Sequence, residues 1–426
     1  MTRQHLIAAF ATLALIATAG PLTAGPLTPP VGPVAPTGKT TQEVFDKVAA
    51  VESRIAINAT NTPGDADSLF KITVPGSYYV TGNVTGVVGK HGIEITAGNV
   101  TLDLGGFTLT GFTAMGNFDG VSVTTPALGS ITVLNGSFRN WGDDGVDLGT
   151  WNAVNCRIEG VHVVNSVGNG VVTGFGTIVS NCSASFNDVS GISTADNCVV
   201  LNCITFYNSI NGIVTGPGSA VSYCSAYANT VSGIATSLGS TVVNCSAYNN
   251  SGGGISVSGG CAVSNCTAYS NTGDGITALD GSTVTSCTVN NNEARGIGAA
   301  NGCQITRCTT RNNALDGISV NFSSTVTGNT CNGDGTAAGN QGGIRVLGQA
   351  NRIEGNNVTY ADRGLLVDSG GNVIIRNTVK GCTLNWSIVA GNAYGAIVAT
   401  PAGAAVSGNT AAAALGTTDP DANFTY

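Results

Sequence analysis

The sequence predicts an all-β fold in which coils of about 21 residues stack as a parallel β-helix. Two observations predict it. Three residue types recur at one fixed spacing over seven units, and short β-branched runs such as ITVL from Ile131 and TVVNC from Thr241 alternate with Gly, Asn, Asp and Ser. Such runs are typical of short strands joined by tight bends. A leucine-rich repeat has a similar period, but its leucine framework is missing.

Each repeated column has a physical interpretation. Small cysteines suit a narrow interior, glycines allow positive φ or close backbone approach at a bend, and stacked asparagines can form an amide ladder. We assign Cys156 to the cysteine column, one irregular unit before its regular members. Cysteine stands at 182, 203, 224, 245, 266, 287 and 308, glycine at 191, 212, 233, 254, 275, 296 and 317, and asparagine at 187, 208, 229, 250, 271, 292 and 313.

The chain begins with the features of a secretory signal peptide. Arg3 precedes an apolar run, and a small-x-small site ends at Ala19, after which we expect cleavage. A proline-rich spacer follows over 20–39, and Val44, Val48, Val51 and Ile55 form one stripe of a helix expected over 40–57, capping a β-helix at 58–410 with a tail at 411–426. We therefore expect a secreted or cell-surface protein.

Composition excludes some partners. Only 9% of the 426 residues are charged, against about 25% in ordinary globular proteins, and the net charge is −8. Phosphate backbones and anionic membranes would be repelled, so nucleic acid is excluded. No window of 18 uninterrupted apolar residues follows the leader, so no membrane span is expected.

Several segments resemble a known family. The opening NATNTPGDADSLFKITVPGSYYVTGNVTGVVGKHGIEI, the stretch VTLDLGGFTLTG and the tail segments GNAYGAIVATP and DANFTY are similar to those of a family of exported bacterial β-helix proteins. The repeats resemble the wider pectate-lyase-like superfamily, which includes pectate lyases and polygalacturonases. The resemblance implies a right-handed parallel β-helix. It does not imply one activity, because lyases, hydrolases, binding proteins and stalks share this fold.

One acidic cluster resembles a catalytic site of that superfamily. NFDGV at 117–121 and WGDDGVDLG at 141–149 are similar to the NTDG and GDDC motifs of polygalacturonases, which implies acid and base roles for Asp119, Asp143 and Asp144. The sequence departs from the pattern afterwards: VGNGV stands where Gly-His-Gly is expected, and no Arg-x-Lys follows. Asp144 also precedes a bend glycine, where turn chemistry explains it equally well.

Two apparent insertions could flank a binding edge. The interval from Cys156 to Gly170 is longer by five than the interval between the cysteine and the glycine of a regular unit, and Asn329 to Gly343 has the same excess. We expect the first insertion to project His162 beside Trp141 and the aspartates, completing a candidate catalytic set. Asp274, Arg295 and Asp316 recur in consecutive coils as a second constellation, which a lyase could use or which could simply relieve stacking of like charges.

An aromatic column is the candidate carbohydrate-binding surface. Phe206, Tyr227, Tyr248 and Tyr269 recur once in each of four consecutive units with a parity opposite to the inward cysteines, so they should face outward, and Trp141 joins them as a candidate sugar contact. The alternative is that the stacked rings stabilise the coil laterally.

The thirteen cysteines follow the coil rather than a pairing scheme, so we expect buried free thiols, with occasional disulfides as the alternative and a cysteine metal site disfavoured. The sequence thus predicts a non-catalytic extracellular protein that is structural or binds a polysaccharide or cell-surface glycan, without a cofactor. The alternative is a polysaccharide lyase or glycoside hydrolase acting on acidic polysaccharide, for which Ca²⁺ is a candidate ion.

Overall fold

A computed structural model describes residue 43, residues 53–112, 114–149, 153–337, 339–399 and 417–425. The expected signal peptide, the spacer, and residues 40–42 and 44–52 of the expected helix lie outside this set. Within it, no helix is long and apolar enough to cross a membrane. Ile55–Ile57 forms strand β1, which pairs in parallel with β3, so the expected helix does not extend to Ile55. Its isoleucine continues a sheet register instead of a helical stripe.

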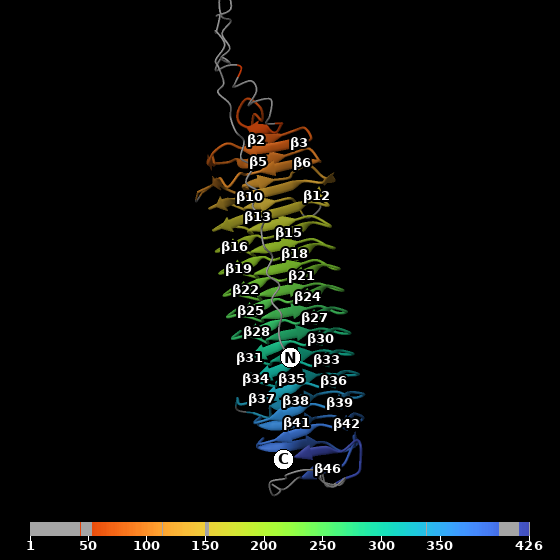
Figure 1. The fold of residues 1–426 in the computed structure, drawn as a ribbon. Coiled ribbons are helices and arrows are strands. Elements are labelled where there is room, and N and C mark those ends of the chain that lie inside the picture. The colour runs from red at the N-terminus through yellow and green to blue at the C-terminus, as the bar shows by residue number, and fades with distance from the viewer. Residues whose placement is uncertain are drawn as a thin grey trace, which may run out of the picture. The chain divides into compact units, whose positions relative to one another are not determined.

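The described residues between 54 and 425 form one parallel β-solenoid, in which each coil contributes its strands to the same columns (Figure 1). One 15-stranded sheet receives the strand that follows each bend glycine. Its members are β2 (Ser68–Ile72), β5 (His91–Ile95), β8 (Val121–Ser122), β11 (Val146–Asp147), β14 (Val171–Thr173), β17 (Ile192–Thr194), β20 (Ile213–Thr215), β23 (Ile234–Thr236), β26 (Ile255–Val257), β29 (Ile276–Ala278), β32 (Ile297–Ala299), β35 (Ile318–Val320), β38 (Gly342–Val346), β41 (Arg363–Val367) and β44 (Leu384–Ile388).

The 30-stranded sheet has two columns, which β10 (Thr132–Arg139) and β13 (Arg157–Val164) span without interruption. The first column holds β1, β3 (Gly76–Val80), β6 (Val100–Asp103), β15 (Ile178–Ser180), β18 (Val199–Leu201), β21 (Ala220–Ser222), β24 (Thr241–Val243), β27 (Ala262–Ser264), β30 (Thr283–Thr285), β33 (Gln304–Thr306), β36 (Thr325–Thr327), β39 (Arg352–Glu354), β42 (Val373–Ile375) and β45 (Ala393–Tyr394). β9 (Leu128–Gly129) and β12 (Ala153–Val154) pair separately.

The second column carries the aromatic residues discussed below. It holds β4 (Val84–Thr85), β7 (Thr108–Thr110), β16 (Ser183–Ser185), β19 (Ile204–Phe206), β22 (Ser225–Tyr227), β25 (Ser246–Tyr248), β28 (Thr267–Tyr269), β31 (Thr288–Asn290), β34 (Thr309–Arg311), β37 (Thr330–Asn332), β40 (Asn357–Thr359), β43 (Thr378–Lys380), β47 (Asn423–Thr425) and β46 (Ile397–Ala399). β47 pairs with both β43 and β46, so the end of the expected tail joins the solenoid.

The strand register confirms coils of the expected length, because Ile234 in β23 pairs with Ile213 before it and Ile255 after it. The register also shows that Cys156 does not belong to the cysteine column to which the sequence assigned it. His162 pairs with Ser183, and Arg157 pairs with Ile178, so Val161 occupies the slot of Cys182 while Cys156 lies in the column of Cys198. Cysteine therefore recurs in two separate columns of the interior, with Cys331 in a third, and the apparent insertion between Cys156 and Gly170 does not exist.

The bend glycines are needed for close approach. A Cβ on Gly254 would lie 2.6 Å from the carbonyl oxygen of Gly275 in the next coil, and no positive φ occurs there. Left-handed backbone instead lies at the other bends, where Asn181 has φ 55° and Asn202 has φ 52°. Asparagine tolerates this region better than other residues with a side chain.

The asparagine column forms the expected ladder. Each side-chain amide from Asn187 to Asn292 donates to Oδ1 of the asparagine one coil later, and the ladder ends at the carboxylate of Asp334, with Nδ2–Oδ1 distances of 2.8–3.1 Å. Asp334 also accepts from the backbone N–H of Asn313 and from Thr310 Oγ1 and is fully buried. A terminal member only accepts, which is why a carboxylate can stand there.

All thirteen cysteines are free thiols, and every one except the half-buried Cys382 is buried. Burial raises the pKa of the Cys331 thiol well above its ordinary value, as expected for an inert interior thiol. The prediction of buried free thiols is confirmed, and no disulfide occurs among the described residues.

Candidate functional site

The acidic cluster is built on a column of polar residues that precede the bend glycines. His91 Nδ1 lies 3.0 Å from the backbone nitrogen of Asp119, and Asp119 Oδ1 accepts the backbone N–H of Asp144 at 3.0 Å. Asp144 Oδ1 accepts the backbone N–H of Asn169 in turn. Asn169 continues this pattern onto Ser190 with an amide oxygen at 3.1 Å. The column therefore links successive coils with or without charge, so its carboxylates have a structural role of their own.

The fold brings three of the four predicted catalytic residues together. One carboxylate oxygen each from Asp119, Asp143 and Asp144 lie within 4.8 Å of one another. Asp119 and Asp144 are buried, whereas Asp143 is partly exposed. Asp144 precedes a bend glycine, as the sequence indicates, but its side chain is buried because it turns along the column to reach the next coil.

Crowding of carboxylates changes their protonation. Burial, reinforced by the charges of Asp119, Asp147 and Asp143, raises the pKa of Asp144 to about 8. Burial and then Asp119 raise the pKa of Asp147 to about 6 and also raise that of Asp143. Asp144 is therefore a protonated carboxyl at neutral pH, next to groups that ionise more readily. Such a difference between neighbouring carboxyls is a feature of acid–base pairs.

His91, which the sequence interpretation missed, completes the cluster. Its Nδ1 lies 3.3 Å from Asp119 Oδ2. Burial lowers the pKa of His91, but hydrogen bonding and attraction to Asp119 outweigh burial and raise it overall. A signal was present, because His91-Gly92-Ile93 repeats the pattern of Asp119-Gly120-Val121 one coil earlier.

Chemically, the cluster could supply a general acid in Asp144, with Asp143 beside it as a second carboxyl group. The three carboxylates could also offer oxygen ligands to a cation, and further oxygens would be needed to reach the six to eight that Ca²⁺ takes. Asp119 is already engaged by His91 and the Asp144 backbone, and Asp144 by the Asn169 backbone and by Asn169 Nδ2 at 3.2 Å.

His162 lies apart from the carboxylates. It is an exposed residue of β13, in the middle of the 30-stranded sheet, and its Nδ1 lies 2.8 Å from Ser183 Oγ. Because no insertion precedes Gly170, no loop carries His162 to the acidic cluster. The projected position of His162 beside Trp141 is therefore wrong.

Trp141 is fully buried and donates its indole N–H to the carbonyl of Leu109 at 3.1 Å. Glycines make room for the ring: a Cβ on Gly92 would lie 2.8 Å from the indole, and a Cβ on Gly120 would lie 2.9 Å from Nε1. Burial leaves Trp141 no surface to offer a sugar, which corrects its expected role.

The predicted aromatic strip exists and consists of Phe206, Tyr227, Tyr248 and Tyr269. Successive ring centroids are 5.0, 4.9 and 4.8 Å apart with planes within 8° of parallel, and all four side chains are half-buried. Rings at this spacing are offset-stacked, so they partly cover one another and present edges and hydroxyls outward. The strip therefore stabilises the coil whether or not it binds a ligand.

Two further rings, missed from the sequence, widen the strip. Phe186 and Tyr207 are 49% and 54% exposed and stack at 5.1 Å, and Tyr207 meets Tyr227 edge-on at 6.3 Å. Both have positive φ, 57° and 54°, in a column where later coils place Asn249 and Asn291. A bulky residue with positive φ is uncommon, so these rings occupy a costly position.

The charged ladder of the later coils is an ion-pair network. Arg295 Nη2 lies 2.9 Å from Asp274 Oδ2, and Arg345 pairs with Asp316 at 3.9 Å and with Asp368 at 2.8 Å. The column alternates in charge as the sequence indicates. Partly exposed pairs of this kind contribute little stability individually.

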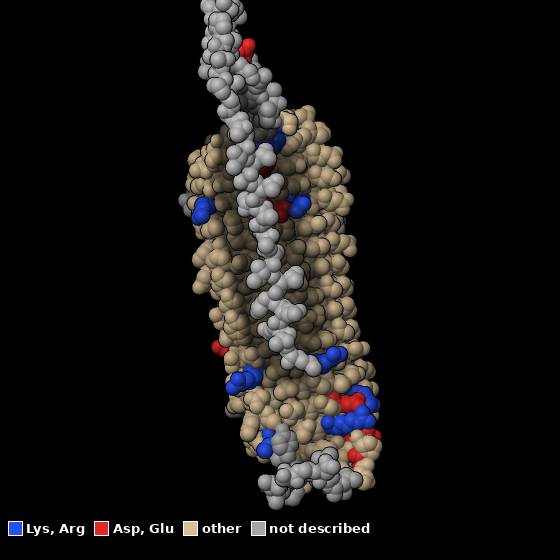
Figure 2. Space-filling model, viewed as in Figure 1, with Lys and Arg blue, Asp and Glu red and all other residues tan. Residues whose placement is uncertain are grey.

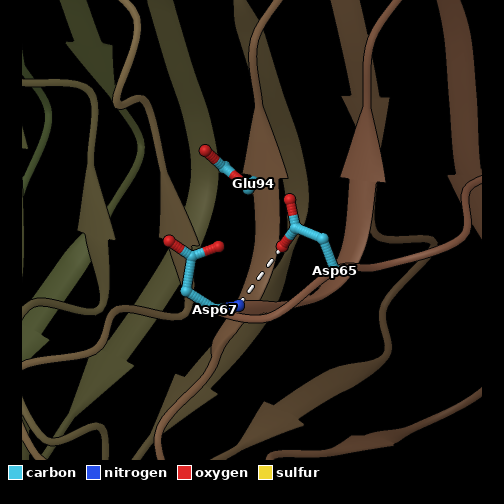
Figure 3. Close-up of side chains that lie close together, drawn as sticks. All are labelled: Asp65, Asp67 and Glu94. Carbon is cyan, nitrogen blue, oxygen red and sulfur yellow. Dashed lines mark hydrogen bonds between the residues drawn. The ribbon is translucent and has the colours of Figure 1, made fainter.

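A second acidic group lies in the first coils, where Asp65, Asp67 and Glu94 approach one another (Figure 3). Lys71 already compensates it, because its Nζ lies 2.6 Å from Asp65 and 2.7 Å from Glu94. These contacts raise the pKa of Lys71 and lower that of Asp65. A cation bound there would have to compete with the Lys71 ammonium for Asp65 and Glu94.

These features define the architecture: the described part of the chain is a parallel β-helix. The family model described as the right handed beta helix region matches residues 214–294 and 258–412. No curated relative matches.

Solved structures with similar coils include enzymes and an adhesin. The mannuronan C-5 epimerase AlgE6 A-module of Azotobacter vinelandii is 15% identical, with 79% of this chain and 93% of that chain covered and a TM-score of 0.44. The periplasmic alginate epimerase AlgG is 12% identical, with 73% and 82% covered and a TM-score of 0.42. PfbA, a surface adhesin of Streptococcus pneumoniae, is 12% identical, with 78% and 91% covered and a TM-score of 0.36. At these identities no activity carries over to this chain.

Proposed function

We propose that this chain is an extracellular protein that binds neutral polysaccharide along its outer surface without cleaving it. The observation that carries the proposal is the aromatic strip with its flanking rings, set in coils without charge. From 197 to 273 the sequence contains no Asp, Glu, Lys, Arg or His. On the face in Figure 2, charged side chains accordingly lie toward the two ends of the solenoid.

Physical chemistry favours a neutral polymer at such a surface. Tyrosine edges and hydroxyls, with the serine and threonine hydroxyls of the same coils, can exchange hydrogen bonds with sugar hydroxyls, and no ion has to be desolvated. The strip runs over four consecutive coils, which is about 14 Å between its end strands. This extended form suits a chain better than a small molecule.

Affinity electrophoresis in gels that contain glucan, mannan, xylan or polygalacturonate tests the proposal. We expect retardation by at least one neutral polymer and none by polygalacturonate. The double variant Y227A/Y248A should lose the retardation, whereas Y394A, which removes an exposed tyrosine far along the chain, should keep it. Retardation by polygalacturonate alone, or retention of binding by the double variant, would contradict the proposal.

A hydrolase is the second candidate, and the raised pKa of Asp144 favours it. A reducing-sugar assay on the same polymers tests it directly. If cleavage occurs and the double variant D143N/D144N abolishes it while the circular dichroism spectrum is unchanged, the acidic cluster is catalytic. Absence of cleavage by the wild-type protein leaves binding as the function.

A further inference from the structure

A cavity lies at the true insertion, one of the two that the sequence indicated could flank a binding edge. Ile318 pairs with Ile297, which lies one regular coil before it. On the other side it pairs with Ile344, which lies farther away along the sequence than one regular coil. The excess between Asn329 and Gly343 is therefore a real insertion. The resulting loop and the next two coils line an open surface cavity of about 590 Å³, a volume in the usual range of ligand sites. Its lining includes Thr336, Gly339, Tyr360, Asp362, Gly381 and Thr383.

Tyr360 is the aromatic wall of this cavity. Its side chain is 61% exposed and its φ is 57°, in the left-handed column that Asn291 and Asn312 occupy elsewhere. The ring lies against Gly381, where a Cβ would stand 2.8 Å from Tyr360 Cε1. A strained, exposed aromatic residue that is fitted over a glycine points to a functional position.

Asp362 supplies an acceptor on the same wall. Its carboxylate is half-exposed, and within the described part of the chain no donor or cation contacts it. The adjacent basic residue is committed elsewhere: Arg363 Nη2 donates to Asn340 Oδ1 at 2.8 Å, and its Nη1 donates to Ser387 Oγ at 3.2 Å. The cavity wall therefore carries a negative charge that no described ion pair compensates.

The insertion loop is held in place before any ligand arrives. In addition to Arg363, Arg345 Nη1 donates to the carbonyl of Asn340 at 3.4 Å, while its Nε is fixed on Asp368 at 2.8 Å. At the base of the loop, Asp334 is tied into the asparagine ladder. A site whose walls are anchored in this way loses little conformational entropy on binding.

We propose that this cavity binds one neutral sugar residue, with the sugar ring against Tyr360 and sugar hydroxyls donating to Asp362. A neutral pyranose fits because its C–H face can contact an aromatic ring while its hydroxyls donate to a carboxylate. A uronic acid is excluded because its carboxylate would face Asp362 without a cation between them. The inference rests on the proposed function and adds a discrete subsite to it, near the C-terminal end of the solenoid.

Titration of cellotriose, mannotriose, xylotriose, maltotriose, triacetylchitotriose and trigalacturonate, followed by calorimetry and saturation-transfer NMR, tests the subsite. We expect at least one neutral trisaccharide to bind and trigalacturonate not to bind. Y360A should weaken binding at least tenfold, and D362N should weaken it several-fold. Y223A is the matched control, because Tyr223 is also exposed, at 62%, with φ 55°, but lies outside the cavity.

The outcomes separate the subsite from the proposed function. Polymer binding that survives Y360A, with no trisaccharide bound by the wild-type protein, overturns the subsite and leaves the strip intact. Absence of both polymer and trisaccharide binding overturns both. Equal affinity of Y360A and wild type, or tight binding of trigalacturonate, also refutes the subsite. D362N keeps the test decisive if Y360A does not fold.

Discussion

The buried end of the asparagine ladder gives the sharpest prediction about stability. Burial outweighs the hydrogen bonds from Thr310 and Asn313 and raises the pKa of Asp334 from 3.8 to about 6. The folded protein therefore holds this proton more tightly than the unfolded chain, so the stability contribution is fully present below pH 4 and is lost as the pH rises to about 6. At about 1.4 kcal/mol for each pKa unit, the loss is about 3 kcal/mol.

The variant D334N should remove this loss. Asparagine can accept the same bonds from Asn313, and its amide can meet Thr310, so the ladder continues without a buried charge. We expect D334N to be more stable than wild type by about 3 kcal/mol at pH 7.5, and the difference to shrink toward zero near pH 4. Urea unfolding of both proteins across this range measures it, and the other titrating carboxyls cancel in the difference.

Asp280 offers the matched control. It accepts the same pair of bonds from the next coil, at 2.9 Å from the backbone N–H of Asn301 and 3.1 Å from its Nδ2, but it is exposed. D280N should therefore change stability by only a few tenths of a kcal/mol at any pH. A D334N protein that is less stable than wild type at pH 7.5, or a difference that does not vary with pH, would refute the reasoning.

Three other expectations follow from the packing. G254A should lower the free energy of unfolding by about 1–3 kcal/mol, because its Cβ would lie 2.6 Å from the next coil. G253A, whose Cβ would have its nearest atom at 3.4 Å, should leave the stability almost unchanged. Thermal unfolding of both variants measures the difference. Ellman's reagent should label Cys382 first in the native protein and the other twelve thiols only after unfolding, and several fast thiols would contradict the burial. Y248A should lower stability by about 1–3 kcal/mol through lost stacking, and a double-mutant cycle with Y227A should reveal the coupling.

The sequence was sufficient for the repeat but not for the phase of every residue. Columns of Cys, Gly and Asn specify the coil because each contacts its own copy one turn away. Cys156 was misplaced because cysteine suits more than one interior column, and only strand pairing shows that Val161 fills the slot of Cys182. If Cys156 had been assigned to the column of Cys198, no insertion would have been expected around His162.

The candidate site was predictable in part for similar reasons. Asp119, Asp143 and Asp144 come together because successive coils repeat the same bend one strand spacing apart, which the sequence spacing alone reveals. Trp141 faces inward because Gly92 and Gly120, remote in sequence, leave it a space, and no local pattern announces such a space. The Tyr360 cavity depends on a loop whose path is set by arginines of later coils.

The uniform register makes the length of this protein a modular property. From 182 to 313 every column repeats at the same interval, so removing or duplicating one such unit would return each amide, thiol and glycine to an equivalent neighbour. A change of any other length would break this match, and a slip by one position would turn inward side chains outward. Stability in such arrays is close to a sum over adjacent turns. The distance between the acidic cluster and the Tyr360 cavity can thus change in steps of one strand spacing while both ends keep their chemistry, which would let the chain be matched to partners of different length.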